Sequence, residues 1–509
     1  MEGDGASGRA NSPLSFLSAL TYALGAVLLA IVIIICAQSS TDPGSVSGVF
    51  VAAAMAVLLG AILSPRAGAL TFVVCYFFAM FMAVPAAVQI SQDSFPFGGS
   101  YSTEQLNAGL LVVALGLLSL LVGMGLASAH GSPKKKDVRT IAGPSTKTAS
   151  AQQSIRLALR LSLVFTAVAA ALGTLAGPSK LFTPRADATD DLVVDSQGLL
   201  IARSFAVVAL LLCIIAIQRP RERTLHHASW LCLIPVAAVA FVVNFPPALP
   251  RFQLLGIVLA VAVLLVDFHR PLVKALFTGM ATFFLFFAFA SVKDLSSNSL
   301  LTSFTPNSLA QWDPGQYLLS VDFDGFKQTV DTLIYYSNAS PRWGVNFLGV
   351  FLFWIPRALW PGKPVPTGQI VSEGLGYWYT NVSNPLPAEA FASWGLAGVI
   401  IVLLIAGVIV MRIERSVLQP GELTVPRLSL YALATGYSTI LLRGALNAVA
   451  PMICTVFVLT VVVNLVYRRY WAFSDSLDEA LLRKTQNGVK RAQVGTAGRR
   501  GQHHTRAHV

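Results

Sequence analysis

Long apolar runs recur along almost the whole chain and are separated by short polar segments. A run of roughly 18 or more apolar residues is typical of a transmembrane helix. Of the 509 residues, 55% are hydrophobic and only 12% are charged, a balance unusual for a soluble protein. The pattern therefore predicts an all-α, polytopic membrane protein. We expect about twelve spans, at residues 16–37, 49–63, 70–90, 106–127, 157–176, 199–217, 229–245, 252–266, 272–292, 395–411, 428–442 and 449–467.

The basic residues predict which side of the membrane each segment faces, because Lys and Arg accumulate in cytoplasmic loops. Nine spans fill residues 16–292 and three fill 395–467. If the N-terminus is cytoplasmic and the spans alternate, 26 of the 36 Lys and Arg residues lie on the inner side and 10 on the outer side. This bias predicts that both termini are cytoplasmic, and it accounts for the net charge of +12. Because the charges are spread over many loops, nucleic-acid binding is not indicated.

The segments between and beyond the spans differ in character. Residues 1–15 form a cytoplasmic tail. The basic cytoplasmic loop 128–156 is predicted to be disordered and the basic cytoplasmic tail 468–509 to be partly disordered, since they are polar and lack an apolar period. Residues 293–394 form one long extracytoplasmic loop that is rich in aromatic residues. An unstructured loop of this length is uncommon in a compact protein. We therefore expect it to be ordered and to carry binding and catalytic residues.

Within this loop, residues 345–355 form an apolar run that is too short for a span and predicts a re-entrant or interfacial helix. A proline ends the run, and Arg357 follows at the expected membrane–water boundary, where Trp354 and Trp360 suit an interfacial position. A guanidinium there can bind a phosphate through two hydrogen bonds, and Lys363 adds a second positive charge. An equally good interpretation is that Arg357 only reaches the lipid headgroups.

Other cations on the outer side are candidates because charge at the edge of a hydrophobic span is costly. Arg443 lies where the eleventh span ends, and Arg203 lies in the first turn of the sixth. These two are the stronger candidates. Arg342 precedes the apolar run at 345–355, and Arg251 is interpreted as a headgroup contact.

Two carboxylates are candidate proton acceptors. Glu389 precedes the tenth span, where it would either stabilise the positive end of a helix dipole or accept a proton from an attacking hydroxyl. Asp324 belongs to an Asp-x-Asp triplet with Asp322, a spacing found at metal–nucleotide sites but also frequent by chance. The five cysteines all lie in apolar runs, and no nucleotide- or metal-binding motif is present. No metal and no cofactor are predicted.

Two neighbouring motifs resemble those of the Wzy-type oligosaccharide repeat-unit polymerases. Residues 354–364 (WIPRALWPGKP) are similar to an Ile-Pro-Arg-x-x-Trp-Pro-x-Lys-Pro block of that family. Residues 387–391 (PAEAF), followed by two glycines, are similar to an acid-led segment that leads into a span. The triplet Asp324-Gly325-Phe326 also fits. The resemblance covers residues 320–410, and the chain departs from the family pattern in the linker between the two blocks.

The resemblance implies a GT-C-like glycosyltransferase in a bacterial plasma membrane. Such an enzyme transfers a growing glycan from its undecaprenyl diphosphate carrier onto the next lipid-linked repeat unit, which extends an O-antigen or exopolysaccharide on the outer face. It needs no metal, and a chain-length regulator and a flippase would be its partners. The implied site comprises Glu389, Asp324 and Arg357 as catalytic residues, with Glu389 the first choice of base and Asp324 the second; Lys363, Arg443, Arg203 and Arg342, with Arg357, at the diphosphate; and Trp354, Trp360 and Trp378 as sugar-stacking or interfacial rings.

Three alternatives remain open at this point. An O-antigen-ligase-like enzyme would use the same donor and a different final acceptor. A glycosyltransferase that uses polyprenyl-monophosphate sugars usually carries acidic residues in its first outer loop, and here that loop has Asp42 alone. A transporter of lipid-linked saccharides would need charged residues at the middle of the membrane, whereas the candidate charges lie at the outer edge.

Overall fold

The computed structural model describes residues 13–38, 41–129, 144–183, 197–218, 223–291, 313–418 and 424–471, and the described residues form helices and turns without a strand. Nine of their helices are long and apolar enough to cross a membrane. Each of the twelve expected spans coincides with a helix, and three of these helices are not among the nine: α11 (Arg251–Leu265) is a shorter apolar helix, α12 (Pro271–Ser291) is an apolar helix of 21 residues whose side chains are described only over Pro271–Phe284, and α19 (Val425–Arg443) is less apolar.

The remaining helices are as follows: α1 (Pro13–Cys36), α2 (Pro43–Leu63), α3 (Ala69–Phe77), the π-helix η1 (Phe78–Ala83), α4 (Val84–Ser91), α5 (Thr103–Ala129), α6 (Pro144–Ala176), α7 (Pro178–Phe182), α9 (Gln197–Gln218), α10 (Arg223–Val243), the 3₁₀-helices η3 (Pro246–Ala248) and η5 (Val321–Phe323), α14 (Pro314–Tyr317), α15 (Gly325–Asn338), α16 (Val345–Phe351), α17 (Thr367–Gly374) and α18 (Leu386–Leu418). A last helix follows at Leu446–Trp471. The chain divides into two compact units, Met1–Phe457 and Val458–Val509, and all contacts below lie within the first.

Two expected boundaries change. The segment 128–156 is not a loop throughout, because α6 begins at Pro144, a favoured residue for a first helical turn. Its part at 130–143 lies outside the described residues, as do 1–12, 292–312 and the tail after Trp471. The apolar run 345–355 is helical only to Phe351 and continues as a turn. Seven residues rise only about 10 Å, so α16 is too short to dip deeply into a bilayer.

Glycines let pairs of membrane helices touch through their backbones. A Cβ at Gly407 of α18 would lie 2.1 Å from the Leu120 carbonyl oxygen of α5, and one at Gly436 of α19 would lie 2.2 Å from the Gly256 oxygen of α11. Small residues are characteristic of helix interfaces in membranes, where close van der Waals packing replaces the hydrophobic effect. Within the first unit, α5 therefore pairs tightly with α18 and α11 with α19, while α6, α9 and α10 pack together through alanines.

Hydrogen bonds between helix ends define two faces of the group of membrane helices. On the first, which we call the insertion face, the Gln89 side chain of α4 donates to the Leu318 carbonyl. On the opposite face, Thr71 of α3 donates its amide to the Glu414 carboxylate of α18 (2.9 Å), and Lys274 of α12 donates to three carbonyls in the last turn of α2 and the connection to α3. Alternating helices produce this grouping of ends.

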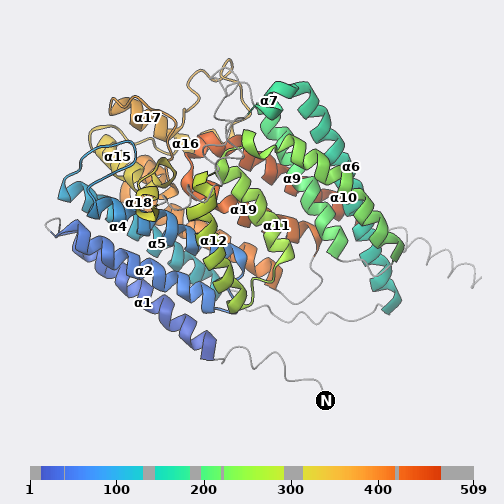
Figure 1. Ribbon diagram of the computed structural model, residues 1–509, viewed down its shortest axis with the longest axis horizontal. Coiled ribbons are helices and arrows are strands. Elements are labelled where there is room, and N and C mark those ends of the chain that lie inside the picture. The colour runs from blue at the N-terminus through green and yellow to red at the C-terminus, as the bar shows by residue number, and fades with distance from the viewer. Residues whose placement is uncertain are drawn as a thin grey trace, which may run out of the picture. The chain divides into compact units, whose positions relative to one another are not determined.

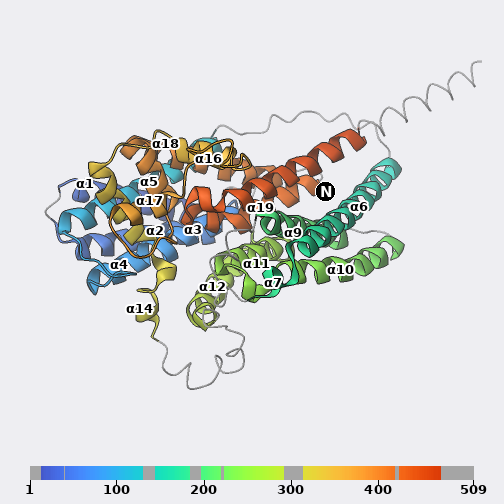
Figure 2. The same cartoon turned by 90° about the horizontal axis from the view of Figure 1, so that it is seen from above.

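Residues 313–385 form an ordered insertion between α12 and α18. Figure 1 shows α15, α16 and α17 gathered beside α4, α5 and α18, and in Figure 2 α16 again lies beside α18. The first turns of α15 are buried on every side, although they carry Lys327, Gln328 and Asp331. The α18 helix is kinked at Trp394 and Gly395, where φ is +62° at the glycine. The kink separates a short helix that carries Glu389 from the long apolar helix that follows.

Candidate functional site

The insertion meets the membrane helices at η5 and the start of α15. Asp324 stands at this junction, and Gly325 follows it because a Cβ there would approach the Met82 sulfur of η1 at 3.0 Å. The Asp324 side chain makes no cap hydrogen bond to its own helix. Its carboxylate instead accepts from the Ser383 amide (3.0 Å) and from Arg443 at the end of α19 (2.9 Å).

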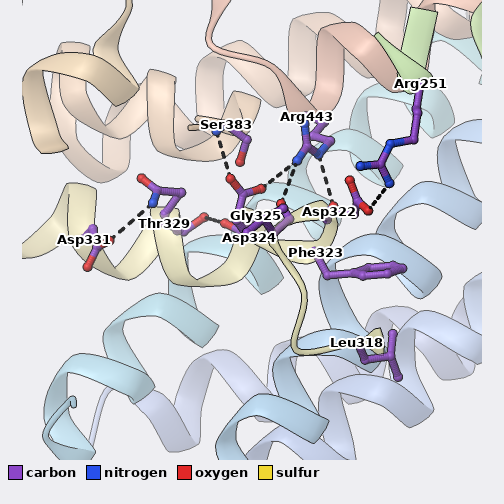
Figure 3. A network of polar contacts seen from close by, with 12 residues as sticks. Arg251, Leu318, Asp322, Phe323, Asp324, Gly325, Thr329, Asp331, Ser383 and Arg443 are labelled. Carbon is purple, nitrogen blue, oxygen red and sulfur yellow. Dashed lines mark hydrogen bonds and ion pairs between the residues drawn. The ribbon is translucent and has the colours of Figure 1, made fainter. Parts of the chain in front are cut away.

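Two arginine–aspartate pairs form at this junction, and we call Arg251, Asp322, Asp324 and Arg443 the Asp324 cluster. Arg251, the first residue of α11, bonds the Asp322 carboxylate at 2.6 Å. Arg443 bonds Asp324 and also donates to the backbone carbonyls of Val321 and Asp322 (3.2 and 3.3 Å). Figure 3 shows Arg443 reaching both aspartates and Arg251 approaching Asp322 from the side.

Aromatic rings pack against the residues of the cluster. Phe323 stacks on Phe81 of η1 at 5.4 Å, and the Arg443 guanidinium lies 4.2 Å from the ring centre of Phe252. The Tyr317 hydroxyl donates to Asp322 at 3.1 Å. Both arginine side chains are 20% exposed, whereas those of Asp322 and Asp324 are 9% and 2% exposed. The guanidinium groups are therefore accessible from one side, and the carboxylates are nearly enclosed.

A second group of buried charges lies further along α15, and we call it the Lys327 cluster: Lys327, Asp331, Tyr101, Tyr377 and Tyr379. Lys327 and Asp331 pair at 2.5 Å, and both side chains are fully buried. Burial alone would lower the pKa of Lys327, but the Asp331 carboxylate and the Tyr379 hydroxyl outweigh it and raise that pKa, so the ammonium stays charged. The Tyr101 and Tyr377 hydroxyls donate to Asp331 at 2.7 and 3.0 Å.

This second cluster joins three parts of the chain rather than exposing a charge. Tyr101 comes from the α4–α5 connection, and Tyr377 and Tyr379 follow α17. The Tyr379 ring stacks on Phe97 at 4.0 Å and on Tyr377 at 5.0 Å. The ring between the two tyrosines, Trp378, is 87% exposed among exposed polar neighbours. The cluster therefore fixes the place of a protruding indole.

Glu389 is fully buried and is surrounded by neutral donors. It accepts from the Asn346 side chain (2.6 Å), the Thr367 hydroxyl (2.7 Å) and the Leu446 amide (3.0 Å). No ion pair to it occurs among the described residues. Glu389 thus connects α18 to α16, to α17 and to the start of the last helix.

Arg357 and Lys363 follow α16 in the chain. Their described hydrogen bonds join them to each other and to nearby carbonyls, and not to Arg443. The Arg357 guanidinium is exposed and donates to the Lys363 carbonyl at 2.9 Å. The Lys363 ammonium donates to the carbonyls of Phe353 and Ile355 and so satisfies the turn after α16. Partial burial and the neighbouring Arg357 both lower the pKa of Lys363.

The helix α16 has its polar side inward. Asn346 is buried against Glu389, whereas five large apolar side chains of this region are 49% to 80% exposed; we call them the α16 surface: Trp343, Leu348, Phe351, Trp354 and Leu359. A water-soluble surface helix has the reverse arrangement. Trp360 is half-buried beside this surface.

Two predicted cations lie elsewhere. Arg203 is buried and donates to the Val243 and Ala248 carbonyls at 3.4 Å, which places it at the end of α10. Arg342 is half-buried next to the Tyr336 hydroxyl, and burial raises the pKa of Tyr336 to about 12 although Arg342 opposes that shift. Of the predicted site residues, the structure therefore joins Arg443 with Asp324, and Arg357 with Lys363.

Sequence reasoning missed several buried partners. Arg251 had been interpreted as a headgroup contact, yet it pairs with Asp322. Lys327 and Asp331 are four residues apart on a helix, a spacing that normally indicates an exposed pair, so their burial had no local signal. The described residues contain no group of three His, Cys, Asp or Glu side chains placed to hold a metal ion.

The geometry offers cations beside carboxylates at the insertion face, which suits the binding of an anion next to a proton acceptor. The chain matches no family model, and neither a curated protein nor a solved structure is detectably similar to it. The family resemblance of residues 320–410 therefore remains a prediction.

Proposed function

We propose that this membrane protein is a glycosyltransferase that polymerises polyprenyl-diphosphate-linked oligosaccharide repeat units on the outer face of a bacterial plasma membrane, without a metal. Both termini are then cytoplasmic, and the insertion face is extracytoplasmic. The observation that carries the proposal is the Asp324 cluster, in which two membrane helices bring partly exposed guanidinium groups to two carboxylates of the insertion. The motifs at 354–364 and 387–391 supply the reaction class by resemblance alone.

The residues suit the chemistry of that reaction. The acceptor hydroxyl oxygen attacks the anomeric carbon of the donor sugar, and the bond from that carbon to the diphosphate oxygen breaks. Arg443 and Arg251 would stabilise the negative charge that develops on the leaving diphosphate. The hydroxyl proton passes to a carboxylate. Asp324, which adjoins Arg443, is favoured for this role, and Glu389 is the second candidate because neutral donors enclose it.

The α16 surface suits contact with the lipid phase. Exposed tryptophan, phenylalanine and leucine side chains next to two cations are typical of a segment at the membrane–water boundary. Arg357 and Lys363 would then lie near the phosphate groups of lipids or of the lipid-linked substrate. Trp378 lies among polar neighbours instead, and an exposed indole there suits stacking on a sugar face.

A ligase-like transfer to a final acceptor is the second candidate, because the same cations would bind the same donor. The two enzymes differ in the product that accumulates. A polymerase variant without activity leaves single repeat units on the lipid carrier, whereas an inactive ligase leaves finished polymer on the carrier. An inactive transporter would also leave single repeat units on the carrier, but on the cytoplasmic side, where the lipid-linked unit is made.

The test is complementation of a strain that lacks the gene. Arg443→Ala should abolish long-chain polysaccharide and cause single lipid-linked repeat units to accumulate, both visible on gels and by mass spectrometry of extracted lipids. Arg270→Ala is the matched control, because Arg270 is an exposed arginine on the opposite face with an exposed Asp267 partner. Unchanged chain length in Arg443→Ala, Arg357→Ala and Glu389→Ala, each present at wild-type levels in the membrane, would contradict the proposal.

A further inference from the structure

The two arginines of the Asp324 cluster form a fixed pair of cations. Arg251 and Arg443 stand at the ends of α11 and α19, which touch through the backbones of Gly256 and Gly436. Because these two backbones are in direct contact, the helices hold the two arginines at a fixed spacing. Each guanidinium is 20% exposed, so the pair presents two positive charges toward the insertion face.

The anions that occupy this pair belong to the chain itself. Asp322 and Asp324 come from a single turn, η5 and the residue after it, and each neutralises one arginine at 2.6 and 2.9 Å. The cluster therefore has two cations and two carboxylates and no net charge. A ligand with two linked anionic groups can bind the arginines only by displacing these carboxylates or by sharing the cations with them.

A second observation indicates that the closed arrangement is not fully satisfied. Among the described residues, the buried side-chain atoms without a hydrogen-bond partner include the hydroxyl of Ser320, which precedes η5, and that of Ser383, whose amide bonds Asp324; the Gln328 Oε1 and Asn384 Nδ2 atoms also lack one. Buried polar groups normally find partners. Unused donors and acceptors on both sides of the turn are suited to hold it in a second position.

We propose that Asp322 and Asp324 act as an internal mimic of the ligand, holding Arg251 and Arg443 in a closed state that a diphosphate group opens by competition. The identity of the diphosphate rests on the proposed function. When it binds, η5 is released, and the Asp324 carboxylate loses its guanidinium partner and is available to accept a proton beside the leaving group. Proton acceptance is thereby confined to the donor-bound enzyme. Arg251 becomes a ligand-binding residue, a role that its sequence position did not indicate.

The proposal makes a prediction of unusual sign: removing an acidic residue should strengthen binding. In Asp322→Asn, the ligand no longer has to compete with the Asp322 carboxylate for Arg251. We expect the full-length protein in nanodiscs to bind geranylgeranyl diphosphate about two- to fivefold more tightly than wild type by calorimetry, the factor that corresponds to a partly exposed ion pair. Arg251→Gln should bind more weakly than wild type. Asp313→Asn is the matched control, since Asp313 is an exposed carboxylate of the same insertion, and it should bind like wild type.

Two ligand arms separate the source of the anion. Inorganic pyrophosphate should show the same order of variants at lower affinity if the diphosphate alone is recognised, and geranylgeraniol, which lacks the diphosphate, should show no difference between variants. If Asp322→Asn is poorly folded, the double variant Arg251→Gln/Asp322→Asn removes the pair as a unit, and it should fold and bind more weakly than wild type. Wild-type or weaker binding by folded Asp322→Asn, or wild-type binding by the double variant, would overturn the competition. The proposed polymerase would fail on a different result, unchanged polymer in Arg443→Ala.

Discussion

The Asp324 cluster and the α16 surface differ in the placement of their charged and polar side chains. In the cluster, four charged groups face one another and pack against phenylalanine rings, and the carboxylates are nearly enclosed. At the α16 surface, the one polar side chain of the helix, Asn346, faces inward and the large apolar side chains face outward. The cations beside it, Arg357 and Lys363, contact only backbone carbonyls in their described hydrogen bonds.

The difference separates two roles that the sequence had merged. Arg357 and Arg443 were both predicted to bind the diphosphate, yet their described bonds place them in different surroundings. A buried network specifies geometry, because an unpaired charge inside it is costly. An exposed cation on an apolar surface contributes attraction to anionic lipid without fixed geometry. We therefore expect the cluster to govern chemistry and the α16 surface to govern position at the membrane.

The largest loss of stability should follow a break in the Lys327 cluster. Lys327→Met leaves the Asp331 carboxylate fully buried with only neutral donors, and breaking such a pair costs about 3–5 kcal/mol. Thermal unfolding in detergent should show a much lower midpoint. The double variant Lys327→Met/Asp331→Leu should recover part of the loss, and a double variant no better than the single one would show that the ion pair is not what stabilises α15.

Glu389 should have a smaller but clear effect on stability. Glu389→Ala leaves Asn346, Thr367 and the Leu446 amide without their acceptor, at a cost of about 1–3 kcal/mol. Glu389→Gln keeps an acceptor oxygen and should be closer to wild type in thermal unfolding. Equal unfolding midpoints for wild type and Glu389→Ala would mean that this junction does not stabilise the insertion.

Fluorescent labels on two exposed tryptophan positions should distinguish the α16 surface from the rest of the insertion without a loss of stability. An environment-sensitive fluorophore on Trp354→Cys, in a protein without other reactive cysteines, should report an apolar medium in proteoliposomes and be quenched by spin-labelled lipid. The same label on Trp378→Cys serves as control and should remain aqueous, because its exposed neighbours are polar. Equal quenching at both positions would remove the distinction between the α16 surface and the rest of the insertion.

Arg357→Ala should have the smallest effect on stability, because the exposed guanidinium makes one described bond, to a backbone carbonyl. The unfolding midpoint in neutral detergent should match that of wild type, and added anionic lipid should raise the midpoint less in the variant than in wild type, with the difference shrinking as salt is raised. A marked drop in the midpoint would show that the turn after α16 depends on Arg357.

The membrane helices could be predicted because apolar runs are a local property of the sequence, and nine helices in the described part of the chain meet the length and hydropathy of a span. Arg443 was named in advance because charges at span ends are costly, and Asp324 was named from its Asp-x-Asp triplet and the family resemblance. The partners were not. Arg251 and Asp322, or Lys327 and Tyr101, are far apart along the chain, and only tertiary packing brings them together.

The central claim, that the Asp324 cluster rather than the α16 surface carries the reaction, is tested most directly by comparing Arg443→Lys with Arg357→Lys. Both keep the charge and lose the planar guanidinium, so the comparison isolates geometry. The measurement is the ratio of single lipid-linked repeat units to polymer in complemented cells at equal protein levels. We predict that Arg443→Lys raises this ratio by about a hundredfold, as expected when an oriented group at the reacting centre is misplaced, while Arg357→Lys stays near wild type. The reverse order would contradict the account.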